Sequence, residues 1–200
     1  MLKNPEYRTV DYSRTILTEL MIPSYSNFGG KVHGGIILGL MDKVAYVTAA
    51  KHAGGYCVTV SMHATDFIAP VEVGDLVHLM ASVDWVGSSS LVVGIKVLAE
   101  NVMTGERRHT NSSYLTMVAV DDEHNPRKVP GLVLESRTDV IRFLKVLRRK
   151  ELIKKHKADL VKVLAETKIE DHIHKLDNQN CRVIGLFDEL ERGNNSMETK

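Results

Sequence analysis

The sequence predicts an α+β fold in which an antiparallel sheet wraps around one long helix. An apolar stretch runs from about Gly34 to His52, and four β-rich runs follow it, joined by short turn-rich links. A helix that is apolar on nearly every face is usually buried on most sides. Consecutive strands with such short links are compatible with antiparallel neighbours. Together these patterns favour one central helix covered by a sheet.

The elements before the sheet are a strand, a loop and the long helix. Residues 14–22 alternate in polarity as a half-buried strand does, and Pro23 ends them. The next segment, SYSNFGGKVHGG, is a glycine-rich loop. The helix is expected over about five turns, and the pair Gly54-Gly55 stops it.

The four expected strands are rich in β-branched and apolar residues. They are separated by PVEVGD, GSSS and NVMTGE, which are rich in turn-forming residues. The strands are expected over Tyr56–Phe67, Leu76–Val86, Leu91–Glu100 and Arg108–Val120.

The composition changes near residue 130, and this predicts a domain boundary. Residues 1–130 contain 11 Lys+Arg and 13 Asp+Glu, whereas residues 131–200 contain 15 and 12. The junction, DDEHNPRKVPG, is a run of turn formers. We therefore expect a compact domain over residues 10–130 and a helical, partly basic C-terminal extension over residues 131–200.

The extension has apolar residues at helical spacing on both sides of a basic centre. This pattern predicts an amphipathic helix that is broken at the basic centre. Its cations could meet anionic lipid, phosphate groups or RNA. Such a face is more often solvated or packed on the domain, and we favour that interpretation.

The composition argues against several classes of protein. A net charge of +1 does not suit a general nucleic-acid binder. No apolar run approaches the roughly 18 to 20 residues of a membrane span, and the first residues show no secretory signal. Cys57 and Cys181 lie far apart without metal-ligand spacing. We expect a cytoplasmic protein with no metal site, no nucleic-acid partner and no stable membrane insertion.

Four ordered blocks of sequence carry a family resemblance. The first is PSYSNFGGKVHGG, which is followed by Met41-Asp42 and Ala45. The others are CVTVSMHATDFIAPVEVGD, the GSSS turn, and ENVMTGERRHTNSSYLTMVAVDDEHNPRKVP. Together they resemble the hotdog-fold acyl-CoA thioesterases, and in particular the brain-type acyl-CoA hydrolases and their bacterial relatives. The resemblance covers roughly residues 10–135.

This resemblance implies the hotdog fold and the hydrolysis of acyl-CoA to free fatty acid and CoA. It implies no cofactor, because CoA is part of the substrate and product. It also implies sites between protomers, so that a homo-oligomer is expected. We expect a dimer as the minimal unit and a trimer of dimers as the assembly, since a lone domain also leaves sheet edges uncovered.

Asp42 is the candidate general base or nucleophile. It is the only acidic residue between Glu19 and Asp66, and it lies among apolar residues of the long helix. Partial desolvation would raise its pKa and suit it to general base catalysis. The structural alternative is that Asp42 caps a neighbour or pairs with Lys43 on an exposed stripe.

Gly34 and Gly35 open the helix, so their amides lack partners within it. Those amides and the helix dipole could stabilise an oxyanion on the thioester carbonyl. Alternatively, the glycines only permit a sharp turn or tight packing. His33 could line the pocket, or it could be a helix-terminus residue satisfied by the backbone.

Asn27 and Lys31 are candidates for binding the acyl-CoA substrate. Lys31 departs from the family pattern, which commonly has at this position an Asn that would position the thioester carbonyl or the water, while Asn27 occupies a different place in the loop. A Lys ammonium could polarise a carbonyl as a point charge but lacks an amide's paired donor and acceptor. We favour contact with a CoA phosphate, or simple exposure, over catalysis for Lys31.

Two further segments could hold the phosphates of CoA through hydroxyls, backbone amides and guanidinium groups. The alternative is that these are ordinary polar hairpin residues. The candidates are Ser88, Ser89 and Ser90 in one turn, and Arg107, Arg108, His109, Thr110 and Asn111 at the start of the last strand.

Two other functions remain open at this level. One is a different hotdog enzyme, a hydratase or dehydratase, whose His/Asp pattern we do not find. The other is a catalytically weak acyl-CoA-binding or regulatory protein, which Lys31 and the basic extension make credible.

Overall fold

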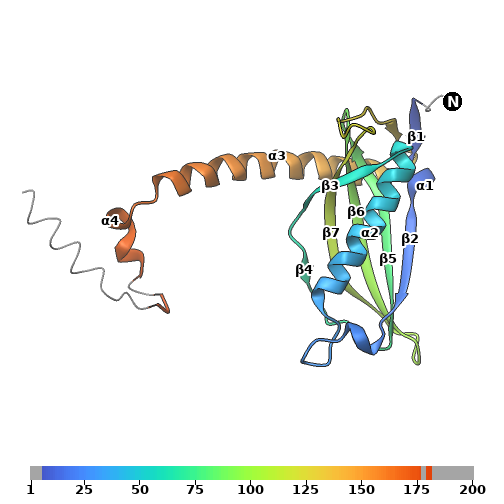
Figure 1. Cartoon of the computed structure of the whole chain (residues 1–200), viewed down its shortest axis with the longest axis horizontal. Helices are drawn as coiled ribbons and strands as arrows, with labels where there is room; N and C mark the ends of the chain where they lie inside the picture. Colours follow the sequence, from blue (N-terminus) through green and yellow to red (C-terminus); the bar gives the residue numbers. More distant parts are fainter. Residues whose placement is uncertain (1–5, 177–178, 182–200) are drawn as a thin grey trace, which may run out of the picture. The chain divides into compact units, whose positions relative to one another are not determined.

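An antiparallel sheet packed on one long helix dominates the first of two units of the chain (Figure 1). The computed structural model describes residues 6–176 and 179–181. The two units are Met1–Lys150 and Glu151–Lys200. The second unit contains the end of α3 (Arg137–Glu166), then α4 (Ile169–His172) and the short 3₁₀ helix η2 (Ile173–Leu176).

The main sheet confirms antiparallel neighbours for the last three expected strands, β5, β6 and β7, but the expected strand over 56–67 pairs with β7 and not with β5, so the link at 68–74 crosses over to β5. Its strand order is β2-β5-β6-β7-β3, every pair is antiparallel, and β4 pairs with β7. The single strand expected over 56–67 is two strands, because the chain leaves the β7 ladder between them. The strands are β2 (Thr15–Leu20), β3 (Cys57–Met62), β4 (Asp66–Phe67), β5 (Asp75–Val86), β6 (Ser90–Asn101) and β7 (Arg107–Ala119).

The predicted central helix is α2 (Gly34–Ala53), and both of its ends are capped. His33 is the N-cap residue. Gly54 ends the helix in the left-handed region at φ 70°, and its amide donates to the Ala50 carbonyl at 2.8 Å. Arg8 and Arg127 donate to the last carbonyls of α2, where cations also interact favourably with the helix dipole.

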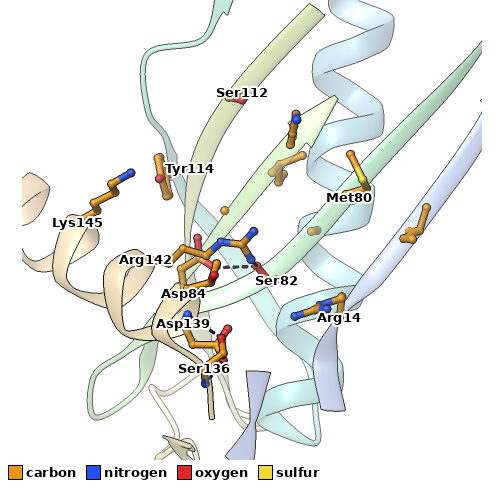
Figure 2. Close-up of a pocket in the computed structure, with 16 residues that line it drawn as sticks. Arg14, Met80, Ser82, Asp84, Ser112, Tyr114, Ser136, Asp139, Arg142 and Lys145 are labelled. Atoms are coloured by element: carbon orange, nitrogen blue, oxygen red, sulfur yellow. Dashed lines mark hydrogen bonds between the residues drawn. The ribbon is translucent and has the colours of Figure 1, made fainter. Parts of the chain in front are cut away.

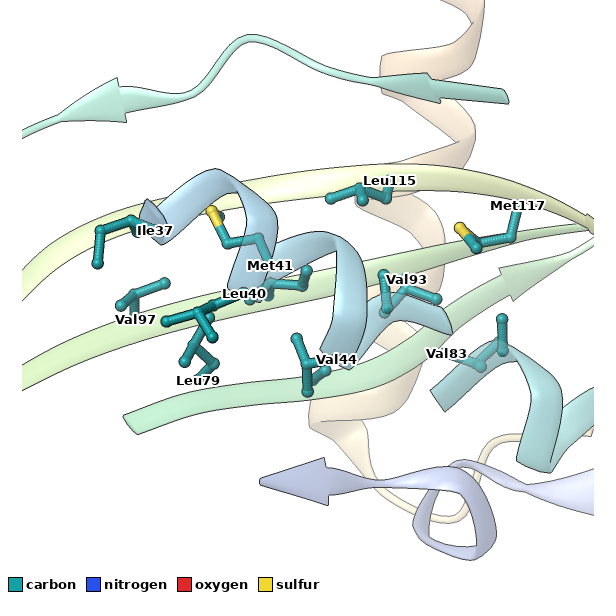
Figure 3. Close-up of a cluster of buried hydrophobic side chains, with 14 of the residues drawn as sticks. Ile37, Leu40, Met41, Val44, Leu79, Val83, Val93, Val97, Leu115 and Met117 are labelled. Carbon is teal, nitrogen blue, oxygen red and sulfur yellow. The ribbon is translucent and has the colours of Figure 1, made fainter. Parts of the chain in front are cut away.

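One side of α2 forms the hydrophobic core with the inner face of the sheet. Figure 3 shows Ile37, Leu40, Met41 and Val44 of α2 among buried side chains of three strands. Each such side chain contributes about 1.5–3 kcal/mol when fully buried. The partners from β5, β6 and β7 are Leu79, Val83, Val93, Val97, Leu115 and Met117.

The remaining short elements lie beside the sheet. β1 (Tyr7–Thr9) pairs in parallel with β8 (Gly131–Val133), and α1 (Val10–Ser13) and the 3₁₀ helix η1 (Pro23–Tyr25) flank β2. β8 and the first turns of α3 belong to the first unit, so the observed division at residue 150 lies beyond the expected boundary at 130.

The expected break in the extension is wrong, because α3 continues without interruption through the basic residues. Lys and Arg are good helix formers, so a cluster of them does not end a helix. No helix in the described part of the chain is long and apolar enough to cross a membrane.

Candidate active site

The N-terminus of α2 presents one free amide and one occupied amide. The Gly35 amide donates to Nδ1 of His33 at 3.0 Å, whereas the Gly34 amide has no hydrogen-bond partner among the described residues. His33 is exposed and acts as a side-chain cap, which is the second of the two roles considered for it. Accepting this bond requires an unprotonated Nδ1. Gly34 is therefore the amide that is ready to meet an anion.

Gly34 also lies under an aromatic ring. A Cβ at this position would approach Cζ of Phe67, on β4, to 3.0 Å. Phe67 is itself 51% exposed, so the ring forms an apolar wall beside the helix terminus. The glycine here serves both tight packing and access to the backbone.

Asp42 lies two turns further along α2 and is bound to β3. Its Oδ1 accepts a hydrogen bond of 2.6 Å from the Thr59 hydroxyl. This bond fixes the orientation of the carboxylate and leaves Oδ2 available. The described residues contain no ion pair between Asp42 and Lys43, so the structural alternative of that pairing is not observed.

The expected desolvation of Asp42 is not present within one chain. α2 is buried along one side only, and Asp42 lies on its exposed side with Gly35, Gly39 and Tyr46. Tyr46 is 40% exposed. The sequence predicts that α2 is buried on most sides, because the residues of this exposed stripe are also largely uncharged. An exposed stripe of glycines and an aromatic residue around a carboxylate is suited to contact with another surface.

The loop before α2 is ordered by Asn27 and Lys31. Oδ1 of Asn27 accepts from the amides of Gly29 at 2.9 Å and Lys31 at 3.2 Å. The Lys31 ammonium is bound by Glu72, with Nζ at 2.6 Å and 2.7 Å from its two carboxylate oxygens. Lys31 is thus held by a neighbouring loop and is not aimed at the Gly34 amide.

The proposed CoA contacts fall at opposite ends of the sheet. Ser88, Ser89 and Ser90 lie where β5 turns into β6, and Arg107 pairs with Glu100 near the other end of β6. A strand of this length separates them by roughly 35 Å. The carbonyls of Ser88 and Ser89 accept from Val129 and Ala119 at 2.9 Å each. One chain therefore does not bring the two segments together.

Most of the second segment is engaged in structural contacts. Arg107 donates to Glu100 at 2.7 Å, Arg108 pairs with Asp75, and His109 bonds within its own strand. Thr110 and Asn111 are fully buried. Asn111 Nδ2 donates to the Asp66 carbonyl at 3.1 Å, which attaches β4 to β7. Neither Thr110 nor Asn111 is accessible to a phosphate in this chain.

Thr59 and Glu72 are site residues that sequence reasoning missed. Each acts through a partner distant in sequence, Asp42 and Lys31 respectively. The only sequence signal for Thr59 is a hydroxyl in the strand that follows the helix. The described residues contain no group of three His, Cys, Asp or Glu side chains placed to hold a metal ion.

Comparisons with known proteins agree with this architecture. Residues 29–106 match the family model described as the thioesterase superfamily. The chain is 39% identical over 144 residues to the protein VdlD of Helicobacter pylori, covering 72% of this chain and 82% of that protein. It is 36% identical over 140 residues to the uncharacterized acyl-CoA thioester hydrolase YkhA of Bacillus subtilis, covering 70% and 81%.

Solved structures show the same likeness. A hexameric acyl-CoA thioesterase solved in its apo form matches with a TM-score of 0.74 and 37% identity, over 77% of this chain and 99% of that one. An acyl-CoA hydrolase of Staphylococcus aureus in complex with butyryl-CoA and CoA matches with a TM-score of 0.70 and 28% identity, over 80% and 99%. That hydrolase has also been solved as separate variants with an aspartate, an asparagine or a threonine replaced by alanine. This chain belongs to the thioesterase superfamily, as a hotdog-fold member of the acyl-CoA thioesterases.

Proposed function

We propose that this chain hydrolyses acyl-CoA to a fatty acid and CoA with Asp42 as the base or nucleophile. The observation that carries the proposal is the 2.6 Å bond from Thr59 to Asp42, which orients a carboxylate on an exposed face of α2. The carboxylate would deprotonate a water that attacks the thioester carbon, or attack that carbon itself to form an anhydride that water then hydrolyses. The Gly34 amide and the positive end of the helix dipole would stabilise the resulting oxyanion. In both routes the C–S bond then breaks, CoA leaves as the thiolate and takes up a proton, and the acyl group leaves as the fatty acid.

We propose that two copies of the chain share each site, and helix geometry supports this. Gly34 precedes Asp42 by eight residues on α2, and at a rise of 1.5 Å per residue they are about 12 Å apart along the axis. The oxyanion donor and the attacking group must both lie about 3 Å from the reacting carbonyl. One helix does not meet that condition. We therefore place the α2 N-terminus of one copy against Asp42 of a second.

The exposed stripe of α2 supports an antiparallel pairing of the two helices. Gly39 lies close to the midpoint between Gly35 and Asp42, and a Cβ built on it would meet nothing within 4 Å. Two helices that cross at Gly39 would bring Gly35 of each copy towards Asp42 of the other. β3 is an edge strand on that side of the sheet and offers unpaired backbone for the same contact.

This contact gives a dimer as the minimal unit, and we propose a trimer of dimers as the complete assembly. Relatives solved as hexamers support this part of the proposal. The contact would also desolvate Asp42, which is the environment expected of a general base.

Asn27 is a better candidate than the residue at position 31 for the side-chain amide that would position the substrate. The three residues replaced in the Staphylococcus aureus variants are spaced along that chain as Asn27, Asp42 and Thr59 are spaced along this one. The Asn27 carbonyl oxygen orders the loop, and its Nδ2 group remains available to a substrate or water. We therefore assign to Asn27, and not to the position of Lys31, the role of the family's Asn in positioning the carbonyl or the water.

The test is release of free CoA thiol from a chain-length series of acyl-CoAs. Asp42→Asn should keep the fold and the assembly but lower turnover by about 10²–10⁴-fold, the usual loss for a missing general base. Lys43→Gln, the adjacent exposed residue, is the matched control and should be nearly unchanged. Unchanged turnover in folded Asp42→Asn would exclude this mechanism. Tight acyl-CoA binding by the wild type without thiol release would favour the acyl-CoA-binding alternative.

A further inference from the structure

A cavity of about 680 Å³ lies on the face of the sheet opposite α2. Its walls are outward side chains of β2, β5, β6 and β7 and the first turns of α3, as Figure 2 shows. The proposed thioesterase site uses α2 and the other side of the sheet. The cavity is therefore separate from the catalytic residues of its own chain.

Beside the cavity, α3 is attached to the sheet by two arginine contacts and by the buried side chain of Val146. Arg142 of α3 donates to the Ser82 hydroxyl at 3.3 Å, and the Arg149 guanidinium lies 5.0 Å from the centre of the Tyr114 ring. Small residues on the sheet, among them Gly94 and Ser112, leave the cavity open.

The two acidic groups of the cavity are withdrawn and already have partners. Asp84 is 5% exposed and accepts from Ser82 at 2.7 Å. A Cβ at Gly94 would collide with this carboxylate, so the glycine makes its position possible. Burial raises the pKa of Asp84 above its usual range. Asp139 is 7% exposed and accepts from the Ser136 hydroxyl at 2.7 Å.

The cationic groups, in contrast, form the accessible part of the lining. Arg14, Lys96 and Lys145 are exposed and Arg142 is half-buried. Figure 2 shows Arg142 beside Ser82, and Arg14 lies at another part of the lining. Among the described residues Lys96 and Lys145 form no ion pair. Arg14 pairs with Asp11 at 3.3 Å, which leaves Lys96, Lys145 and Arg142 as three cations without an ion pair among the described residues, against two occupied carboxylates. The cavity therefore keeps unneutralised positive charge.

We propose that this cavity is a second binding site, which takes a small anion carrying phosphate groups. Guanidinium and ammonium groups at the rim would bind the phosphate oxygens, and the hydroxyls of Ser112 and Tyr114 would add neutral donors. The ligand would contact both the sheet and α3, so it would hold the start of α3 on the sheet. This proposal does not depend on thioester hydrolysis.

The first experiment measures binding of sodium pyrophosphate to the full chain by calorimetry at constant ionic strength. The double variant Lys96→Met with Lys145→Met should weaken binding by about tenfold or more, through loss of two charge-assisted contacts. Lys128→Met with Lys168→Met removes the same charge from exposed positions elsewhere and should bind like the wild type. Circular dichroism checks the fold of each variant, and Lys145→Gln alone provides a milder test.

Two further arms identify the ligand and the consequence of binding. Equal affinity for pyrophosphate and ADP would assign the site to phosphate alone, whereas tighter binding of ADP would assign it to a nucleotide. Because the ligand binds the folded state, pyrophosphate should raise the melting temperature of the wild type more than that of the Lys96/Lys145 variant. The proposal is overturned if the wild type shows no binding, or if both double variants weaken binding equally.

Discussion

At the scale of single residues, the proposed chemistry depends on the hydrogen bond from the Thr59 hydroxyl to the Asp42 carboxylate. Thr59 donates to Asp42 from a different element, so the strand directs the helix-borne carboxylate. A carboxylate held by one oxygen presents the other in a fixed direction, which favours attack on a positioned carbonyl. Thr59 is therefore a positioning residue, acting through Asp42.

Replacing Thr59 with Val tests this role, because Val has nearly the same shape without the hydroxyl. A hydrogen bond to a charged group is worth about 1.5–3 kcal/mol, so kcat should fall roughly 10-fold to 100-fold. KM should change little, and Thr59→Ser should restore most of the turnover. Steady-state kinetics of thiol release make the comparison. A purely structural role would instead lower thermal stability and leave kcat of the folded variant intact.

Residues whose roles are local could be predicted from the sequence, and those that act through distant partners could not. The helix-opening position of Gly34 and the isolation of Asp42 follow from spacing along one helix. The roles of Thr59 and Glu72 depend on contacts between distant segments: Thr59 on β3 faces Asp42 of α2, and Glu72 faces Lys31 in the loop before α2. No spacing in the sequence encodes which residues face each other in this way. The separation of Ser89 from Arg107, in contrast, already follows from the expected strand over 91–100, because the two residues lie beyond its opposite ends.

At the level of elements, α2 combines a buried face that the sequence predicts with an exposed face that it does not. The apolar run from Ile36 to Ala53 is sufficient to predict a helix. Its uncovered stripe around Gly39 carries little charge, so the sequence could not distinguish burial by the same chain from burial by a second copy. Strands of three residues, such as β1 and β8, are too short to leave a periodic pattern.

Gly39→Leu is expected to separate folding from assembly. No atom lies within 4 Å of a Cβ at this position, and Leu favours helix over Gly by roughly 0.5–1 kcal/mol. The chain should therefore fold at least as well, while the bulky side chain keeps two α2 helices apart. Light scattering should show a smaller species, and thiol release should be lost. A fully assembled, active Gly39→Leu protein would contradict the crossing at Gly39, and Gly39→Ala should give an intermediate result.

The C-terminal end of α2 carries a pH-sensitive group in His52. The side chain is fully buried, and Nε2 lies 3.1 Å from the Pro130 carbonyl. Burial lowers the pKa of His52, and the nearby Arg8 charge lowers it further, while the Pro130 carbonyl opposes the shift. Because the folded state binds the proton less readily, stability should decline as pH falls below the unfolded value of about 6.5.

His52→Gln should remove that part of the pH dependence, because Gln retains a donor for Pro130 and does not titrate. Urea denaturation at about pH 5.5 and 7.5, on either side of the ordinary His pKa, gives the free energy of unfolding. The loss of stability at the lower pH should be smaller in His52→Gln than in the wild type. His156→Gln, at an exposed position of α3, is the control and should keep the wild-type dependence. An unchanged dependence in His52→Gln would assign the acid sensitivity to other groups.

For the whole molecule, the decisive quantity is the distance between the two halves of the site. An antiparallel pair of α2 helices turns the separation of about 12 Å within one helix into a contact between two. Each dimer then contains two sites, and each site takes its helix terminus from one copy and its carboxylate from the other. This arrangement makes inactive variants able to rescue one another.

Complementation between Asp42→Asn and Gly35→Val is the last prediction. A side chain at Gly35 would lie against the His33 ring and over the helix terminus, so each variant alone should be nearly inactive for a different reason. In a mixed dimer, the Asp42→Asn chain supplies an intact terminus and the Gly35→Val chain an intact carboxylate. Equal mixing with free exchange makes half of the dimers mixed, each with one good site, so about a quarter of wild-type activity should return. Mass spectrometry of differently tagged chains verifies the exchange. Mixed dimers without recovered thiol release would show that each chain carries its own complete site.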